Sequence, residues 1–173
     1  MLEEPKKIGE GGDYETLEDA LRNQQPGVSL SLPPGEQVFD EPVIINKSFA
    51  LLSGSQEPAV IKAPLIKFDM EPSVFCVCTN VKFIGKIEIV NGSTVTFEDC
   101  HFYCEEECPA IVTVTDSSPT FRICHFHDFA GVGVNYFGTK GGIITDCTFE
   151  NISGEMIMKN DNAKPFSDHN TKK

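Results

Sequence analysis

The sequence predicts an all-β fold, a right-handed parallel β-helix of about six coils with an N-terminal helical cap. The main observation is a motif that recurs after 24 and then 23 residues, at 97–102, 121–126 and 144–149. Each copy contains an apolar residue, two mostly polar residues, a cysteine, one polar residue and a phenylalanine. A period of this length is typical of a solenoid, because each repeat buries its apolar face only against its neighbours.

Short strand patterns fill most of the chain after Gly27. Residues 28–32 alternate apolar and polar side chains, and the later apolar runs are short and bounded by Pro, Gly, Asn or Ser. A second short strand follows each motif, as at residues 111–114 and 132–134. No helical pattern separates these strands, which argues against an α/β sheet with crossover helices. Three short strands per repeat indicate one coil of a right-handed parallel β-helix.

One amphipathic helix is predicted ahead of the strands, over residues 13–24. Asp13 is the expected N-cap, and Leu17 and Ala20 lie on the apolar face. This helix is expected to cover the first open end of the solenoid, which otherwise exposes core side chains and unpaired backbone groups. Residues 1–12 are polar and glycine-rich, and are expected to be flexible.

The β-helix domain is expected to span residues 13–158, and residues 159–173 are expected to form a flexible tail. These last residues are polar and show no periodicity, so they predict no second cap. The far end of the solenoid is therefore expected to be open. We expect it to contact another copy of the chain, another domain or the folded-back tail.

The residue before each cysteine position indicates a tight corner. Asn80, Asp99 and Asp146 hold this position in three coils, and Asn and Asp tolerate the left-handed conformation that such a corner needs. Ile123 holds the same position in another coil. Because isoleucine disfavours that conformation, the corner at Ile123 is expected to differ.

Composition narrows the possible partners. The formal net charge is -12, which disfavours binding to nucleic acid or to an anionic membrane surface. The seven cysteines are an odd number, and three of them share one repeat position, so they are expected to be buried thiols rather than a disulfide framework. The N-terminal residues lack the apolar run of a signal peptide. These features together predict a cytoplasmic, intracellular protein.

A family resemblance supports the predicted fold. Residues 14–21, followed by Leu32-Pro33-Pro34-Gly35-Glu36, resemble the entry to pectin-lyase-like β-helices, where a cap helix leads into a strand that ends in Pro-Gly. The Asp-Cys-His-Phe and Asp-Cys-Thr-Phe copies resemble the coil repeats of that superfamily, most closely the carbohydrate-binding-and-sugar-hydrolase-type repeats of intracellular proteins. The resemblance covers residues 13–158. It implies a fold but no activity, because the superfamily includes lyases, hydrolases, esterases and non-enzymes.

One surface is the best candidate for contact with a ligand or partner. His101 and His125 occupy the same position in adjacent coils and are predicted to point outward, since they alternate with inward Cys and Phe. The full predicted surface contains His101, His125, His127, Arg122, Glu98 and Tyr103. Glu98 and Arg122 are expected to be aligned and to pair across coils. The alternative is ordinary polar decoration of a sheet.

A second feature is the loop Cys104-Glu105-Glu106-Glu107-Cys108. Two thiols with three carboxylates would bind a metal or, if oxidised, close a disulfide, whereas the alternative is a solvated acidic loop. A zinc site needs further ligands, for which only His101 or His127 is available. No metal and no cofactor are therefore expected.

No catalytic residues are predicted. The coils carry one arginine, Arg122, without the cluster of carboxylates that pectate-lyase-like catalysis requires, and the polygalacturonase-like motifs are absent from the sequence. The predicted function is a non-catalytic β-helix module, for binding or scaffolding, that recognises a protein or glycan partner. The alternative is a carbohydrate-active enzyme, a polysaccharide lyase or hydrolase, or a degenerate relative of one.

Overall fold

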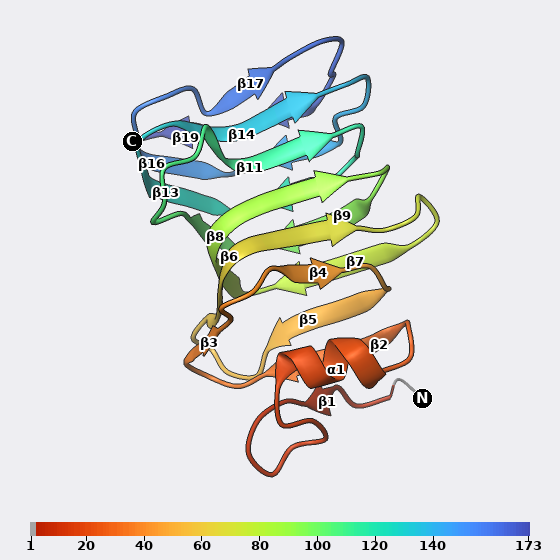
Figure 1. The fold of residues 1–173 in the computed structure, drawn as a ribbon. Helices are drawn as coiled ribbons and strands as arrows, with labels where there is room; N and C mark the ends of the chain where they lie inside the picture. Colours follow the sequence, from red (N-terminus) through yellow and green to blue (C-terminus); the bar gives the residue numbers. More distant parts are fainter. Residues whose placement is uncertain (1–2) are drawn as a thin grey trace.

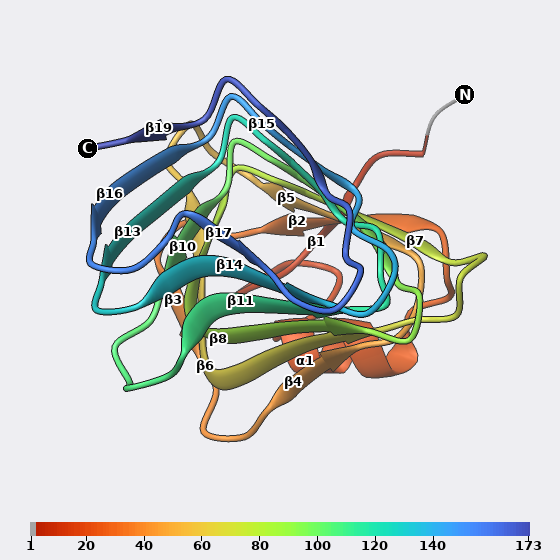
Figure 2. The same ribbon diagram turned by 90° about the horizontal axis from the view of Figure 1, so that it is seen from above.

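The computed structural model describes residues 3–173, which form an all-β parallel solenoid of about seven turns (Figure 1). The predicted fold class is confirmed, with more turns than the sequence predicts. Strands of adjacent turns pair in parallel, and successive turns lie over one another when viewed along the solenoid axis (Figure 2). Like residues of neighbouring turns are therefore brought into register.

Two sheets form the walls of the solenoid. The first has eight strands: β1 (Lys6–Lys7), β2 (Val28–Leu32), β5 (Phe49–Ser53), β7 (Phe75–Thr79), β9 (Thr94–Glu98), β12 (Thr120–Arg122), β15 (Ile143–Thr145) and β18 (Phe166–Asp168). The second has eleven strands: β3 (Glu36–Val38), β4 (Val43–Ile45), β6 (Ala59–Asp69), β8 (Val81–Val90), β10 (His101–Tyr103), β11 (Ala110–Thr115), β13 (His125–Phe129), β14 (Val132–Phe137), β16 (Thr148–Ile152), β17 (Ile157–Lys159) and β19 (Thr171–Lys172).

The eleven-stranded sheet bends within its two longest strands, β6 and β8. The first half of β8 pairs with β10 and its second half pairs with β11. Gly85 lies at the bend with a φ of 134°, and a Cβ added there would lie 1.9 Å from the carbonyl oxygen of Ala63. Glycine is required because the two backbones approach so closely. In the next turn, a loop that contains Cys104 and Cys108 replaces this single residue.

The predicted column of phenylalanine rings is confirmed. The ring centroid of Phe126 lies 4.8 Å from that of Phe102 and 4.6 Å from that of Phe149, and the planes differ by 12° and 5°. All three side chains are fully buried. Aromatic pairs of this kind contribute about 0.5–1.5 kcal/mol beyond the burial of their surface, so the column stabilises the stacking of successive turns.

The predicted cysteine column is also confirmed. Cys100, Cys124 and Cys147 are buried, and all seven cysteines are free. Burial raises the pKa of Cys100 to about 12, so this side chain remains a protonated thiol at neutral pH. The three residues pack as small apolar side chains, and the buried, protonated Cys100 thiol is chemically inert.

The predicted left-handed corner is present in every coil that shows the motif. Its φ angles are 54° at Asn80, 52° at Asp99 and 55° at Asp146. The expectation that Ile123 would differ is wrong, because its φ is 53°. Ile123 is also 44% exposed. The requirement of the coil for a tight turn therefore overrides the conformational preference of this β-branched residue.

The N-terminal region differs from the prediction in detail. The helix, α1 (Leu17–Asn23), is shorter than predicted, and Thr16 is its N-cap, with its hydroxyl oxygen accepting a hydrogen bond from the Asp19 N–H at 3.1 Å. Asp13 instead accepts a hydrogen bond from the Lys7 N–H at 2.8 Å, which closes the turn after β1. Strand β1 pairs with β2, so this part of residues 1–12 is ordered sheet, and residues 1–2 lie outside the described chain. Helix α1 lies at the first end of the solenoid, next to β4 (Figure 1).

The C-terminal residues form a further, partial turn where the sequence predicts a tail. Strand β18 pairs with β15, and β19 pairs with β16. In this turn Ser167, Asn170 and Lys172 take the inward positions that Ile144, Cys147 and Phe149 hold in the turn before. Their polar groups are satisfied there: the Asn170 side chain accepts from the Cys147 N–H and donates to the Ile144 carbonyl, both at 2.9 Å. The part of the far end formed by β18 and β19 thus carries polar side chains at the inward positions.

Candidate functional site

Four of the six predicted surface residues gather on one face of the eleven-stranded sheet. His101 lies opposite His125 on neighbouring strands, and their rings stack with centroids 4.7 Å apart. Tyr103 and His127 stack beside them, with centroids 5.6 Å apart and planes within 4°. We call these four residues the histidine strip. The regular register of the coils positions the strip, because each ring extends from the same place on its turn.

The stacking decides what the histidine strip can bind. The rings stack on rings of the neighbouring turn, at interplanar angles of 19° and 4°. One face of each ring therefore contacts the other ring of its pair, while the outer faces of the pairs and the ring edges with their polar groups are left for other contacts. A sugar ring packs on an exposed aromatic face, and the stacking reduces the number of such faces. Imidazole nitrogens and a phenol hydroxyl favour hydrogen bonding or metal coordination instead.

The surroundings of His101 disfavour its protonated form. Burial lowers the pKa of His101, and the neighbouring His125 and His127 lower it further. Asp128 borders the strip, and the Asn151 amide donates a hydrogen bond to its carboxylate at 2.9 Å. This hydrogen bond, with a 3.0 Å contact to His127, lowers the pKa of Asp128.

Asp99 joins the strip at the left-handed corner. Ligand-type atoms of Asp99, His101 and His125 all lie within 4.8 Å of one another. The sequence assigns Asp99 only to the geometry of the corner and predicts no metal. The motif could have predicted that Asp99 lies near His101, because the corner residue comes two positions before the first outward residue of the next strand.

The other two predicted residues, Glu98 and Arg122, lie on the eight-stranded sheet. They are directly in register on β9 and β12, as predicted. Within residues 3–173, however, no ion pair joins them. The predicted surface is therefore divided between two sheets that meet at the corner.

The Cys104–Cys108 loop brings its two thiols together. Their Sγ atoms lie 3.2 Å apart, and burial, followed by the contact with Cys104, raises the pKa of Cys108 to about 12. The Glu105 carboxylate in the same loop pairs with the Lys62 ammonium group at 2.7 Å. The raised pKa keeps the Cys108 thiol protonated at neutral pH.

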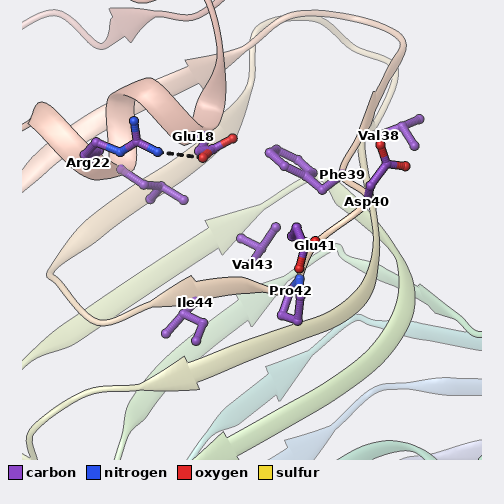
Figure 3. Close-up of a pocket in the computed structure, with 10 residues that line it drawn as sticks. Glu18, Arg22, Val38, Phe39, Asp40, Glu41, Pro42, Val43 and Ile44 are labelled. Carbon is purple, nitrogen blue, oxygen red and sulfur yellow. Dashed lines mark hydrogen bonds and ion pairs between the residues drawn. The ribbon is translucent and has the colours of Figure 1, made fainter.

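A groove that the sequence does not predict lies between α1 and β4 (Figure 3). It has a volume of about 490 Å³ and is lined by Glu18, Leu21, Arg22 and residues 38–44. Two of the lining side chains are exposed and apolar, since Val38 is 61% and Ile44 is 50% exposed. We call this feature the α1–β4 groove. No sequence signal marks it, because its lining combines helix residues with residues 38–44, which are distant in the sequence.

The walls of the α1–β4 groove are fixed relative to each other. The ammonium group of Lys47, just after β4, donates to the carbonyl oxygens of Leu21 and Arg22 at 3.2 and 3.3 Å. These carbonyls lie at the C-terminal end of α1, where a cation is favourable. The lysine thus ties the strand side of the groove to the helix side. On the helix, the Glu18 carboxylate accepts a hydrogen bond from Arg22 at 2.7 Å (Figure 3).

Comparison with known proteins places the fold in a family. Residues 73–171 match the model of the family described as "Right handed beta helix region". The chain belongs to this family. No curated protein matches the chain. Within the described residues, no helix combines the length and apolar character that crossing a membrane requires.

A solved structure with a similar fold is the pectin methylesterase from Aspergillus niger in deglycosylated form. The TM-score is 0.59 at 11% sequence identity, and the match covers 97% of this chain and 85% of that chain. The predicted resemblance to pectin-lyase-like β-helices is thus confirmed for the fold. At this level of identity the likeness concerns the fold alone.

Proposed function

We propose that this chain is a non-catalytic protein-binding module, and that its α1–β4 groove receives an extended segment of a partner protein. The observation that carries the proposal is the free edge of β4 beside the groove. Strand β4 pairs with β6 on one side, and no strand within residues 3–173 pairs with its other side. An unpaired edge next to apolar side chains is the surface that peptides use when they add a strand to a sheet.

Charge favours a partner segment with basic side chains. Arg22 already pairs with Glu18, while the acidic residues Asp40 and Glu41 line the groove and are exposed. The net charge of -12 adds a long-range attraction for cations. Val38 and Ile44 supply apolar contacts on the same surface. We therefore infer a segment in which apolar and basic side chains alternate, since alternate residues of a strand face the same way.

A protein partner fits these surfaces better than a glycan. In the histidine strip one face of each ring is covered by its stacked partner, and the chain contains no tryptophan. The groove combines apolar side chains with carboxylates, whereas a neutral glycan mainly needs paired hydrogen-bonding groups. A polyanionic glycan such as pectate would be repelled by the acidic surface.

The alternative function, a carbohydrate-active enzyme, follows from the fold shared with a pectin methylesterase. Pectin is accordingly the first polysaccharide to test, by assays for released methanol, reducing ends and unsaturated uronides. Our proposal expects no turnover above that of a heat-denatured sample. Turnover that scales with protein concentration would favour the enzyme instead.

The binding proposal is tested with a short fluorescent peptide in which valine and lysine alternate. Fluorescence anisotropy is expected to show saturable binding that weakens as salt is added, because the attraction is partly between exposed charges. A peptide with glutamate in place of lysine is expected not to bind.

Two matched variants test whether the peptide binds in the α1–β4 groove. Ile44→Lys places a cation and removes an apolar contact in the groove, and is expected to weaken binding by about tenfold, equivalent to about 1.4 kcal/mol. Ile143→Lys changes an isoleucine that is 42% exposed on the eight-stranded sheet, and is expected to leave binding unchanged. Equal binding by both variants would exclude the α1–β4 groove as the binding site.

A further inference from the structure

We propose that Asp99, His101 and His125 bind one divalent transition-metal cation, with zinc as the best match. This site shares no residue with the α1–β4 groove, and so it does not depend on the proposed function. The three side chains come from two adjacent turns: Asp99 and His101 lie at one corner, and His125 lies directly across in the next turn. They offer two imidazoles and one carboxylate, a donor set that is common in zinc sites with an open position.

The distances require only a small adjustment of side chains. The three ligand-type atoms lie within 4.8 Å of one another. Ligands of a tetrahedral zinc ion lie about 3.4 Å apart, given metal–ligand distances of about 2.1 Å. Each pair therefore needs to close by at most about 1.4 Å. Asp99 is exposed and both histidines are partly exposed on the outer face, so rotation of their side chains is available without moving the interior column.

The solenoid presets the direction of the ligands. Because His101 and His125 are in register and their planes differ by 19°, both rings extend outward from adjacent strands in nearly the same direction. Asp99 has a φ of 52°, and this fixed corner directs its carboxylate to the same side. The nitrogen lone pairs lie in the ring planes, so the two stacked rings would have to tilt toward each other to coordinate one metal beyond their edges. Asp99 would then be the third ligand, and water would fill the remaining position.

The neighbouring charges determine how strong the site is. Lys82 occupies the position in register with His101 in the preceding turn, and its charge opposes a bound cation. The Asp99 carboxylate offsets that charge. Imidazole ligands favour zinc, cobalt and nickel, whereas calcium and magnesium prefer oxygen ligands. We therefore expect binding of Zn²⁺ and Co²⁺ and little response to Ca²⁺ or Mg²⁺.

The experiment is a calorimetric titration of the full, reduced chain with Zn²⁺, with Ca²⁺ as the comparison cation. One zinc ion per chain is the expected result. His101→Ala and His125→Ala are each expected to weaken binding by at least about tenfold, since disturbing even the outer partners of metal ligands has an effect of this size. His169→Ala alters a histidine at the corresponding corner of the last turn, and is expected to change nothing.

Three further measurements separate this site from the cysteines and from loss of fold. The Co²⁺ absorption spectrum is expected to lack sulfur-to-cobalt charge transfer, and Cys104→Ser is expected to bind Zn²⁺ as the wild type does. In a zinc titration followed by NMR of the unmodified chain, the His101 and His125 ring signals are expected to shift, while the His169 signals stay in place. Charge transfer from sulfur, or zinc affinity that is unchanged in His101→Ala, would overturn the proposal.

Discussion

The middle turns and the last turn of the solenoid follow the same backbone path but differ in their inward side chains. These side chains are apolar in the middle turns and polar in strands β18 and β19 of the last turn. In the middle turns one inward column consists of Phe83, Phe102, Phe126 and Phe149, all fully buried. In the last turn the same column ends at Lys172, whose ammonium group donates to the Gly154 carbonyl at 2.6 Å. The solenoid thus stops without a change in coil geometry, because polar residues replace the core at fixed positions.

This difference indicates that different features of the chain determine the shape of each coil and the point at which the solenoid ends. Backbone pairing carries the coil forward, while the inward side chains decide whether another turn would have a core to pack on. Terminal repeats of solenoids are commonly polar for this reason. At the other end the same column begins at Gln37, so polar residues limit it on both sides.

The largest expected effect comes from removing a ring in the middle of the column. Phe102 lies within 5.5 Å, between ring centroids, of Phe83, Phe97 and Phe126. Phe102→Ala leaves a cavity that its rigid neighbours cannot fill, and should lower the free energy of unfolding by about 3–5 kcal/mol. Equilibrium denaturation with urea measures this change.

The matched control is Phe166→Ala, which removes the same ring from an outward position in the last turn. Phe166 is 59% exposed, so its loss should change stability by less than about 0.5 kcal/mol. If the two variants were equally destabilised, the distinction between the middle column and the terminal turn would be incorrect.

The sequence predicts the middle of the molecule well because its columns repeat the same residue types. Phe102, Phe126 and Phe149 identify the period, and the cysteines two positions earlier confirm which side faces inward. The last turn is missed because Ser167, Asn170 and Lys172 occupy the same positions with polar side chains. A search for repeated apolar residues cannot detect a turn that shares only its backbone conformation with the other turns.

The candidate site is predicted in part for a related reason. Register alone places His101 beside His125, so the sequence could locate that pair. Whether Arg122 faces the same way depends on the left-handed corner that separates its strand from the histidines, and the corner puts it on the other sheet. The α1–β4 groove depends on how the helix docks on the first turn, which no local pattern specifies.

An intermediate effect on stability is expected at the corner residue Ile123, whose conformational preference conflicts with the left-handed backbone at this position. Ile123 has a φ of 53°, a conformation that is unfavourable by about 1–2 kcal/mol for a residue with a Cβ. Ile123→Asn relieves this strain but loses the partial burial of the isoleucine, which is worth about 1 kcal/mol for a half-buried side chain. The net result should be a stabilisation of at most about 1 kcal/mol, measured by thermal and urea unfolding.

The reciprocal variant at the next corner sharpens this test. Asp146→Ile places an isoleucine at a φ of 55° on an exposed position, and should destabilise the chain by about 1–2 kcal/mol. If Asp146→Ile were neutral, the coil would hold this corner without strain, and the comparison with Ile123 would lose its basis.

The smallest expected effect on stability comes from extending the column into the last turn. Lys172→Phe places a ring in register with Phe149, and should change the free energy of unfolding by less than about 1 kcal/mol, because one face of the new ring remains open to water. The open face should instead change association, since apolar ends of solenoids stack on one another. Sedimentation at increasing concentration should show Lys172→Phe associating more strongly than the wild type. If the wild type associates as strongly as the variant, the polar residues of the last turn do not limit association between chains. The contact with another copy that the sequence predicts at this end would then describe the wild type better.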